Sequence, residues 1–265
     1  MKPLLSICIP TYNRLPYLKE LLTDLLPQLD AVDSGQVELI VSNNASTDGT
    51  ENFCQSISRP YLRCRKNEVN IGGDRNFLKC IQEARGEYVW LVGDDDLVPS
   101  GAVQKILDIL GCLRPGLVIS DFAVSVERET YADYGEFLER NCRNSKAAAL
   151  RHTLISANIF QRASFDLSFA ERWLSTQYAH MFGLVQGLHG SIVRTSGLIA
   201  VRSVRAAFAQ YPSCLCVKQA IYLKYLAARF EQPQFRRFAF FNACNLPIEY
   251  ASRFKSWMIR RFCGA

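Results

Sequence analysis

The sequence contains no uninterrupted apolar run of about 18 residues, the length that a membrane-spanning helix requires, so no such helix is expected. Internal repeats and low-complexity segments are also missing, which argues against a solenoid and against extended disorder. The N-terminal apolar run ends at Pro10 without a small-residue cleavage site and is therefore predicted to be a first strand. With 49% hydrophobic and 21% charged residues, the 265-residue chain can bury one large core.

A CxxC pair is absent, and the ten cysteines show no regular spacing. Because no secretion signal precedes them, reduced thiols are expected in preference to a disulfide framework, many of them as small core residues.

Acidic residues are scarce toward the C-terminus. After Val193, twelve basic residues accompany only Glu231 and Glu249, whereas the part up to Val193 has 19 basic and 23 acidic residues. This uneven distribution of charge predicts two parts of the chain, residues 1–195 and residues 196–265. The second part is expected to bind an anionic partner.

The first 125 residues alternate between strand and helix patterns, which predicts an α/β fold with a mostly parallel, Rossmann-type sheet flanked by helices. Strands are expected at 4–10, 37–42, 61–66, 87–93 and 116–126, with a helix after each of the first four and Pro99 in the first turn of the fourth. Later segments predict strands at 154–160 and 189–195 and helices at 175–188, 216–230 and 248–262, the last two in a basic helical extension. Ligands bind beyond the carboxyl ends of such strands, where the polar clusters TYNR, SNNASTDGT and GDDD lie.

Three consecutive carboxylates, Asp94, Asp95 and Asp96, follow the most apolar predicted strand. Like charges repel at this spacing, and a bound divalent cation such as Mg²⁺ or Mn²⁺ would neutralise them and stabilise a departing diphosphate. The alternative is an acidic turn in which one aspartate caps the next helix and two lie in solvent.

Four segments in this order, SICIPTYNR, NNASTDGT, NIGG and YVWLVGDDD, resemble the family 2 glycosyltransferases. The resemblance covers residues 4–110 well and 111–195 loosely. It implies the GT-A fold, a nucleotide-diphosphate-sugar donor and a D-x-D metal motif that holds Mn²⁺ or Mg²⁺. The GDDD form is most similar to the abequosyltransferase-like subgroup of O-antigen, lipopolysaccharide and polysaccharide biosynthesis enzymes.

The resemblance also implies roles for residues near the first two strand ends. Pro10, Thr11 and Tyr12 would line the nucleotide pocket, and Arg14 would either touch a phosphate or lie on the surface. Asn43 and Asn44 stand where the family often has two acidic residues, of which the first usually contacts the base. An Asn both donates and accepts hydrogen bonds, so base recognition remains possible while the nucleotide preference changes.

In the third segment, Gly72 and Gly73 would allow close approach to a ligand, and Asp74 and Arg75 lie at a helix start that favours anions. A plain glycine turn is the alternative.

The fourth segment leaves the metal ligands open between two pairs. A literal D-x-D motif selects Asp94 and Asp96, whereas an alignment in which Gly93 replaces the first aspartate selects Asp95 and Asp96. Asp96 belongs to both pairs, and Asp94 and Asp95 also lie where the donor's diphosphate would be held.

Inverting transfer needs a general base, which family members usually supply as Asp or Glu from a helix after the metal motif. The sequence has no clear equivalent there. His180 is the first candidate, with Glu171 and Asp166 as alternatives, because a His can act as a base near neutral pH. A His among Tyr178 and other large side chains can also be a plain core residue.

In the C-terminal region, aromatic residues alternate with basic ones, which suits an anionic membrane surface, a helical packing face or, least well, nucleic acid. The sequence therefore predicts an inverting glycosyltransferase that is peripherally bound to the inner face of a bacterial plasma membrane. Its acceptor would be a polyprenyl-phosphate-linked glycan. A catalytically silent sugar-binding or assembly subunit of the same fold, and a nucleotidyltransferase of related architecture, are the alternatives.

Overall fold

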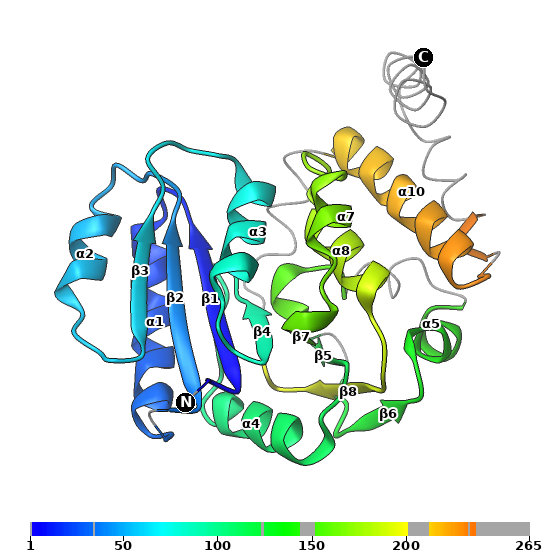
Figure 1. Cartoon of the computed structure of the whole chain (residues 1–265), viewed down its shortest axis with the longest axis horizontal. Helices are drawn as coiled ribbons and strands as arrows, with labels where there is room; N and C mark the ends of the chain where they lie inside the picture. The colour runs from blue at the N-terminus through cyan, green and yellow to red at the C-terminus, as the bar shows by residue number, and fades with distance from the viewer. Residues whose placement is uncertain are drawn as a thin grey trace. The chain divides into compact units, whose positions relative to one another are not determined.

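The computed structural model describes residues 2–33, 35–122, 125–143, 152–200, 212–232 and 234–236 (Figure 1). The chain divides into two compact units. The first unit comprises Met1–Phe137 and Arg151–Arg202, and the second comprises Leu138–Leu150 and Ser203–Ala265. The predicted helix at 248–262 lies outside the described residues, and the boundary predicted at residue 195 stays a prediction.

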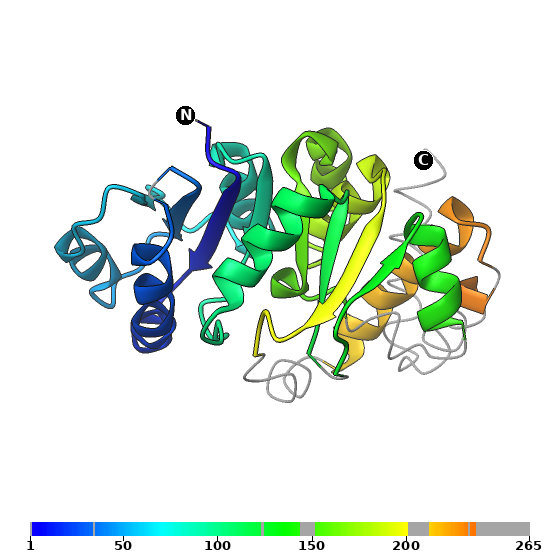
Figure 2. The ribbon, with the colours of Figure 1, turned by 90° about the horizontal axis from the view of Figure 1, so that it is seen from below.

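One eight-stranded sheet, with strands in the order β3-β2-β1-β4-β7-β5-β8-β6, organises the first unit. Strands β7 and β6 pair antiparallel with their neighbours, and the remaining pairs are parallel, which confirms the predicted α/β class. The first four strands form one half of the sheet and the later strands form the other half (Figure 2). The strands are β1 (Leu5–Thr11), β2 (Val37–Asn43), β3 (Leu62–Lys66), β4 (Tyr88–Leu91), β5 (Leu117–Asp121), β6 (Glu129–Tyr131), β7 (Asn158–Gln161) and β8 (Ile192–Ser196).

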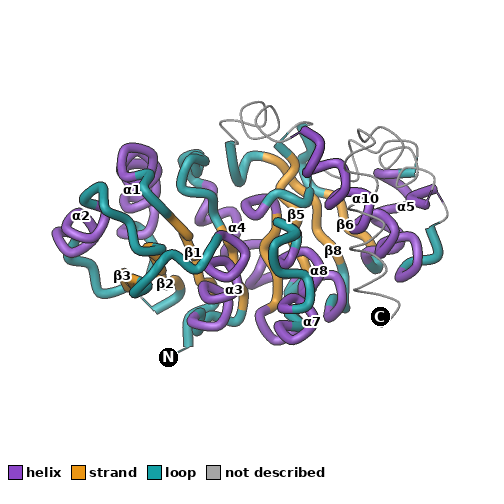
Figure 3. Tube along the Cα trace, turned by 90° about the horizontal axis from the view of Figure 1, so that it is seen from above, coloured by secondary structure: helices purple, strands orange, loops and turns teal. Residues whose placement is uncertain are grey.

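Helices cover both faces of this sheet (Figure 3). Helices α1 and α4 contact each other on one face, and α3 and α8 contact each other on the opposite face. The helices are α1 (Leu15–Asp30), α2 (Thr50–Ser56), α3 (Gly73–Glu83), α4 (Ala102–Leu113), α5 (Tyr134–Cys142), α7 (Leu167–Glu171), α8 (Ala179–Gly187) and α10 (Pro212–Arg229), with 3-10 turns η1 (Ile155–Ala157) and η2 (Arg162–Ser164).

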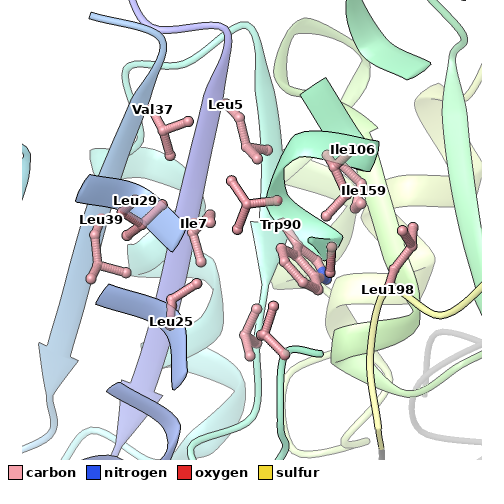
Figure 4. Packing of buried hydrophobic residues seen from close by; sticks show 14 of the residues in the cluster. Leu5, Ile7, Leu25, Leu29, Val37, Leu39, Trp90, Ile106, Ile159 and Leu198 are labelled. Atoms are coloured by element: carbon pink, nitrogen blue, oxygen red, sulfur yellow. The ribbon is translucent and has the colours of Figure 1, made fainter. Parts of the chain in front are cut away.

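The alternation of side chains along β1 explains how the two helical layers attach. Leu5, Ile7 and Ile9 join the core cluster with the leucines of α1, whereas Cys8 points to the other face and donates to the Cys80 carbonyl of α3. Trp90 of β4 is fully buried at the centre of the cluster, beside Ile106 and Ile159 (Figure 4). Its indole N–H donates to the Ser156 carbonyl at 2.9 Å, so the largest core side chain also anchors turn η1.

Several details differ from the sequence predictions. Helix α8 begins at Ala179, later than the predicted start at residue 175, because Ser175 and Gln177 have positive φ values, and helix α7 was not predicted. Helix α4 begins after Gly101, which has a φ of 80°, and not at Pro99, because the chain turns through a left-handed residue before the helix starts. Residues 155–157 form a 3-10 turn, and only the end of the predicted 154–160 segment is a strand. Strand β6 and helix α5 were not predicted, since their charged residues hide the periodicity.

The described cysteines with defined side chains, Cys8, Cys54, Cys64, Cys80, Cys112 and Cys142, are free thiols, as expected. Within the ranges given above, no helix combines the length and the apolar character that crossing a membrane requires.

Candidate functional site

The register of the parallel strands brings the first and fourth predicted segments together. Cys8 of β1 pairs with Leu91 of β4, so three residues further along each chain Thr11 is level with Asp94. The Thr11 hydroxyl donates to Asp94 Oδ2 at 2.7 Å. Because Thr11 also pairs with Asn43 at the end of β2, the three strand ends converge on one edge of the sheet.

Arg14 lies against two of the three carboxylates. Its Nη1 is 3.1 Å from Asp94 Oδ1 and 2.9 Å from Asp95 Oδ2. Burial raises the pKa of Asp94, and the Thr11 hydrogen bond and the Arg14 charge oppose this shift. Arg14 thus neutralises part of the acidic cluster, and its contact with a phosphate stays a prediction.

Asp96 is held by turn η1, which was not expected from the sequence. Ser156 Oγ accepts from the Gly93 N–H at 2.8 Å and donates to Asp96 Oδ2. A Cβ at Gly93 would lie 2.9 Å from Asp96 Oδ2, so a larger residue there would force this carboxylate to shift. Ser156 belongs to η1, 60 residues from Asp96, and a lone Ser in the segment LISANIF carries no signal of this role.

The donor set at this edge suits a hard divalent cation, because carboxylate oxygens are the ligands that Mg²⁺ and Mn²⁺ prefer. Within the described part of the chain, no group of three or more His, Cys, Asp or Glu side chains forms a complete metal site. Mg²⁺ is, however, usually bound by one or two carboxylates together with substrate phosphates, and buried Asp94 and Asp96 meet that requirement.

The loops after β1 and β2 are tied together by side chains. Asn13, with a φ of 53°, accepts from the Thr47 N–H at 2.8 Å, and its own N–H donates to Ser46 Oγ at 2.9 Å. Asp48 accepts from the backbone N–H groups of Leu15 and Thr50, so it binds the first turns of both α1 and α2. Asp48 therefore satisfies one free backbone N–H at the start of each of these two helices.

Asn43 presents a single free hydrogen-bonding group. Its Oδ1 accepts from the Ser46 N–H at 2.8 Å, which fixes the orientation of the amide, and its buried Nδ2 has no hydrogen-bond partner. Asn44 instead uses its whole amide within the protein: Nδ2 donates to Asn70, and Oδ1 accepts from Asn67 and from the Ile71 N–H. The two asparagines therefore differ in what they can offer a ligand.

Gly72 has a φ of 84° and precedes α3, as expected for a glycine turn that opens a helix. The Asp74 carboxylate accepts from the Gln177 N–H at 3.0 Å through Oδ2, while its Oδ1 is buried without a partner. Ser175 and Gln177 both have positive φ values, 71° and 65°, and this strained turn leads directly into α8. The third segment is thus connected to the helix that carries His180.

His180 is buried, and its imidazole packs edge-on against Phe77 of α3. Nε2 lies 2.9 Å from the Thr153 carbonyl, which can only accept, so Nε2 carries the proton. Burial lowers the pKa of His180, against the Thr153 hydrogen bond and the nearby Asp74 charge. The neutral ring therefore holds its lone pair on Nδ1, which has no hydrogen-bond partner.

The two alternative bases lie elsewhere on this half of the sheet. Asp166 caps α7, and its Oδ1 accepts from the Phe169 N–H at 2.8 Å. Glu171 is exposed at the end of the same helix. The Asp166 carboxylate is thus engaged in its own helix, and the choice of base stays a prediction.

The other predicted nucleotide contacts occupy different environments. Pro10 is buried within β1, whereas the Tyr12 side chain is 44% exposed just beyond the strand end. Gly73 begins α3, and Arg75 is exposed on its first turn. An exposed aromatic ring and an exposed guanidinium at this edge are available to a ligand.

Solved structures with the same arrangement define the class of protein. S. aureus TarS 1–349 in complex with UDP-GlcNAc superposes with a TM-score of 0.59 at 18% identity, over 90% of this chain and 70% of that one. A mannosyltransferase, PcManGT from Pyrobaculum calidifontis, in complex with GDP-Man and Mn²⁺, gives a TM-score of 0.55 at 15% identity, over 98% and 84% of the two chains. The described sheet and its helices thus have the GT-A fold of glycosyltransferases.

Sequence comparison then gives the family. The glycosyl transferase family 2 profile matches residues 6–174, and the chain belongs to this family. It is 45% identical over 204 residues to abequosyltransferase RfbV of Salmonella typhimurium, which covers 68% of this chain and 59% of that protein. It is also 29% identical over 108 residues to the GalNAc(5)-diNAcBac-PP-undecaprenol beta-1,3-glucosyltransferase of Campylobacter jejuni, over 40% and 34% of the two chains. The chain thus spans less than two thirds of the length of these relatives.

Proposed function

We propose that the protein is a metal-dependent, inverting glycosyltransferase that moves a sugar from a nucleotide-diphosphate donor to a glycan acceptor in cell-surface polysaccharide synthesis. The observation that carries this proposal is the cluster Asp94–Asp96, held at the carboxyl edge of a GT-A sheet by Thr11, Arg14 and Ser156. Membership of family 2 and the similarity to RfbV support the reaction class.

Each part of the site has a task in this reaction. Asp96, with Asp94 or Asp95, would hold Mn²⁺ or Mg²⁺, which stabilises the negative charge that develops on the departing diphosphate. Asn43 and Tyr12 would bind the nucleoside, and Arg75 at the start of α3 would contact phosphate. His180 Nδ1 would accept the proton of the acceptor hydroxyl as the sugar carbon is attacked, with Glu171 and Asp166 as the other candidates.

Product formation by the full chain tests the proposal. A panel of nucleotide-diphosphate sugars is incubated with Mn²⁺, with Mg²⁺ or with EDTA, and release of the nucleoside diphosphate is measured beside calorimetric binding. We expect binding and release to depend on the cation. Full activity in EDTA would contradict the proposed metal role, and binding without release for every donor and acceptor would favour the silent sugar-binding subunit.

Nucleobase choice provides a prediction that is specific to this chain. The unpartnered N–H of Asn43, when it faces the ring nitrogen of a base's pairing edge, matches cytosine and adenine, which present an acceptor there, and not uracil and guanine, which present N–H, so we expect cytosine or adenine to bind better. Asn43→Asp keeps the acceptor for the Ser46 N–H and replaces the free donor by an acceptor. We expect this substitution to reverse the preference, by about tenfold or more in Kd, in calorimetric titrations of four nucleoside diphosphates.

Asn44→Asp is the matched control for nucleobase choice. This variant changes an amide whose groups are all used within the protein, and its carboxylate would face Asn70 Oδ1. We expect a lower melting temperature with the base preference unchanged. If Asn43→Asp leaves the ranking of the four nucleotides as it is in the wild type, Asn43 does not contact the base.

The acceptor and the membrane surface belong to the same proposal. The Campylobacter relative is named for an undecaprenol-linked substrate, which supports a polyprenyl-phosphate-linked acceptor at the inner face of the plasma membrane. Most of the basic C-terminal region lies outside the described residues, so its role is argued from sequence alone.

Vesicle flotation of the full chain tests the membrane interaction. We expect binding to vesicles that contain anionic lipid, release at high salt, and weaker binding after Arg260→Glu with Arg261→Glu. Equal binding to neutral and anionic vesicles would contradict an electrostatic contact by this region.

A further inference from the structure

A single nitrogen of Arg14 serves two neighbouring carboxylates. Nη1 lies within 3.1 Å of Asp94 Oδ1 and 2.9 Å of Asp95 Oδ2, and Thr11 occupies the other oxygen of Asp94. Both oxygens of Asp94 are therefore bonded to donors of the protein itself. The positive charge of the guanidinium lies beside the oxygens that the proposed function gives to a divalent cation.

The backbone of Arg14 is held by hydrogen bonds, whereas its side chain is half exposed and, apart from the two carboxylates, lies over the ring of Tyr17. Its carbonyl accepts from the Leu18 N–H in the first turn of α1, and Asp48 holds the next residue, Leu15. The Arg14 side chain is 48% exposed, whereas that of Asp94 is 7% exposed. The guanidinium can leave the carboxylates by rotation about side-chain bonds, without any change in the helix or the strand.

Electrostatics favours two alternative partners for this guanidinium. Adjacent ionised carboxylates repel each other, and Arg14 offsets that repulsion. A divalent cation on the same oxygens would repel Arg14, but a diphosphate offers it paired oxygens that match the guanidinium geometry. The guanidinium therefore loses its contacts with the carboxylates when the cation binds them, and contacts with the diphosphate replace these.

We propose that Arg14 is a positioning residue that couples donor binding to cation binding. The guanidinium holds Asp94 and Asp95 in place of a cation, and it moves to the diphosphate of the donor when the donor binds, which frees these carboxylates so that one of them can hold Mn²⁺ or Mg²⁺ together with Asp96. The inference rests on the proposed function. Because coupling is reciprocal, the cation and the nucleotide each tighten the binding of the other by the same factor.

Binding of Mn²⁺ itself, without turnover, tests this coupling. The full-length wild type, Arg14→Gln and the control Arg59→Gln are titrated with Mn²⁺, with free Mn²⁺ measured by electron paramagnetic resonance. Each titration is done alone and with the tightest-binding nucleoside diphosphate of the panel. Arg59 forms a comparable exposed ion pair with Asp30, away from this site, so its replacement controls for the loss of a surface charge.

For the wild type we expect weak binding of Mn²⁺ alone and at least about tenfold tighter binding with the nucleotide, within the usual range of coupling. Arg14→Gln should bind Mn²⁺ alone several-fold more tightly, bind the nucleotide more weakly, and lose most of the coupling. Arg59→Gln should match the wild type, and thermal melts establish that each variant is folded.

Two results overturn the inference in different ways. If Arg14→Gln binds Mn²⁺ alone no more tightly than the wild type and keeps the coupling, Arg14 has no such role, and the proposed function stands. If neither Mn²⁺ nor any nucleotide binds to the folded wild type, the proposed function fails and the inference with it.

Discussion

Asp96→Asn is expected to reduce sugar transfer and donor hydrolysis by about 1,000-fold, because in the proposed site it removes a charge that would hold the cation and, through it, the diphosphate. The Asn oxygen still accepts from the Ser156 hydroxyl, so the turn that positions Gly93 is retained. Melting temperature should therefore change little. The decisive measurement is turnover as a function of Mn²⁺ concentration.

Two comparisons make this result specific. Asp24→Asn removes an exposed carboxylate from α1 and should leave turnover and Mn²⁺ dependence at the wild-type level. Asp96→Ala removes the acceptor as well as the charge, and we expect it to be less stable than Asp96→Asn, since Ser156 loses its partner. Wild-type turnover in folded Asp96→Asn would remove Asp96 from the metal site.

His180→Gln is expected to lower the rate of transfer by about 10²–10⁴-fold, the usual contribution of a general base, with donor affinity unchanged. The Gln amide N–H replaces Nε2–H as donor to the Thr153 carbonyl, so the substitution removes the lone pair on Nδ1 and keeps the buried hydrogen bond. A purely structural His would show a loss of stability instead. Initial rates and donor titrations separate the two roles.

The pH profile gives an independent check on His180. A base must be neutral, so the wild-type rate rises with pH until the imidazole is deprotonated. Because burial lowers the pKa of His180, this rising limb is expected below pH 6.5, the ordinary value for His. Folding depends on pH in the same direction: the stability that the neutral ring provides is present above pH 6.5 and is lost as pH falls through its pKa.

The alternative bases predict different outcomes. Asp166→Asn retains a side-chain oxygen to accept from the Phe169 N–H, so it tests the carboxylate charge without removing the helix cap. Glu171→Gln changes only an exposed charge. If Asp166→Asn or Glu171→Gln abolishes the rise of the transfer rate with pH while His180→Gln retains it, the base is the carboxylate that was replaced.

Much of the first unit could be predicted from the sequence, for a physical reason. Strand and helix periodicity is local, and alternating elements force parallel crossovers, so the ends of β1, β2 and β4 had to meet at one edge. The polar segments at those ends therefore lie at one edge of the sheet, as predicted, and their common role as a site stays a prediction. The antiparallel insertion of β7 between β4 and β5 could not be predicted, because pairing between distant segments is set by long-range packing.

The family, the fold class and the acidic cluster at a strand end follow from the amino-acid sequence, since each depends on short segments of neighbouring residues. How the side chains of these segments contact one another depends on the three-dimensional packing. Arg14 faces the carboxylates across 80 residues, Ser156 supports Asp96 across 60, and Ser46 leaves Asn43 only one free group. Such contacts depend on side-chain geometry between elements, which neither composition nor spacing encodes. The expected nucleobase preference and the expected coupling of cation and nucleotide binding are both argued from these contacts.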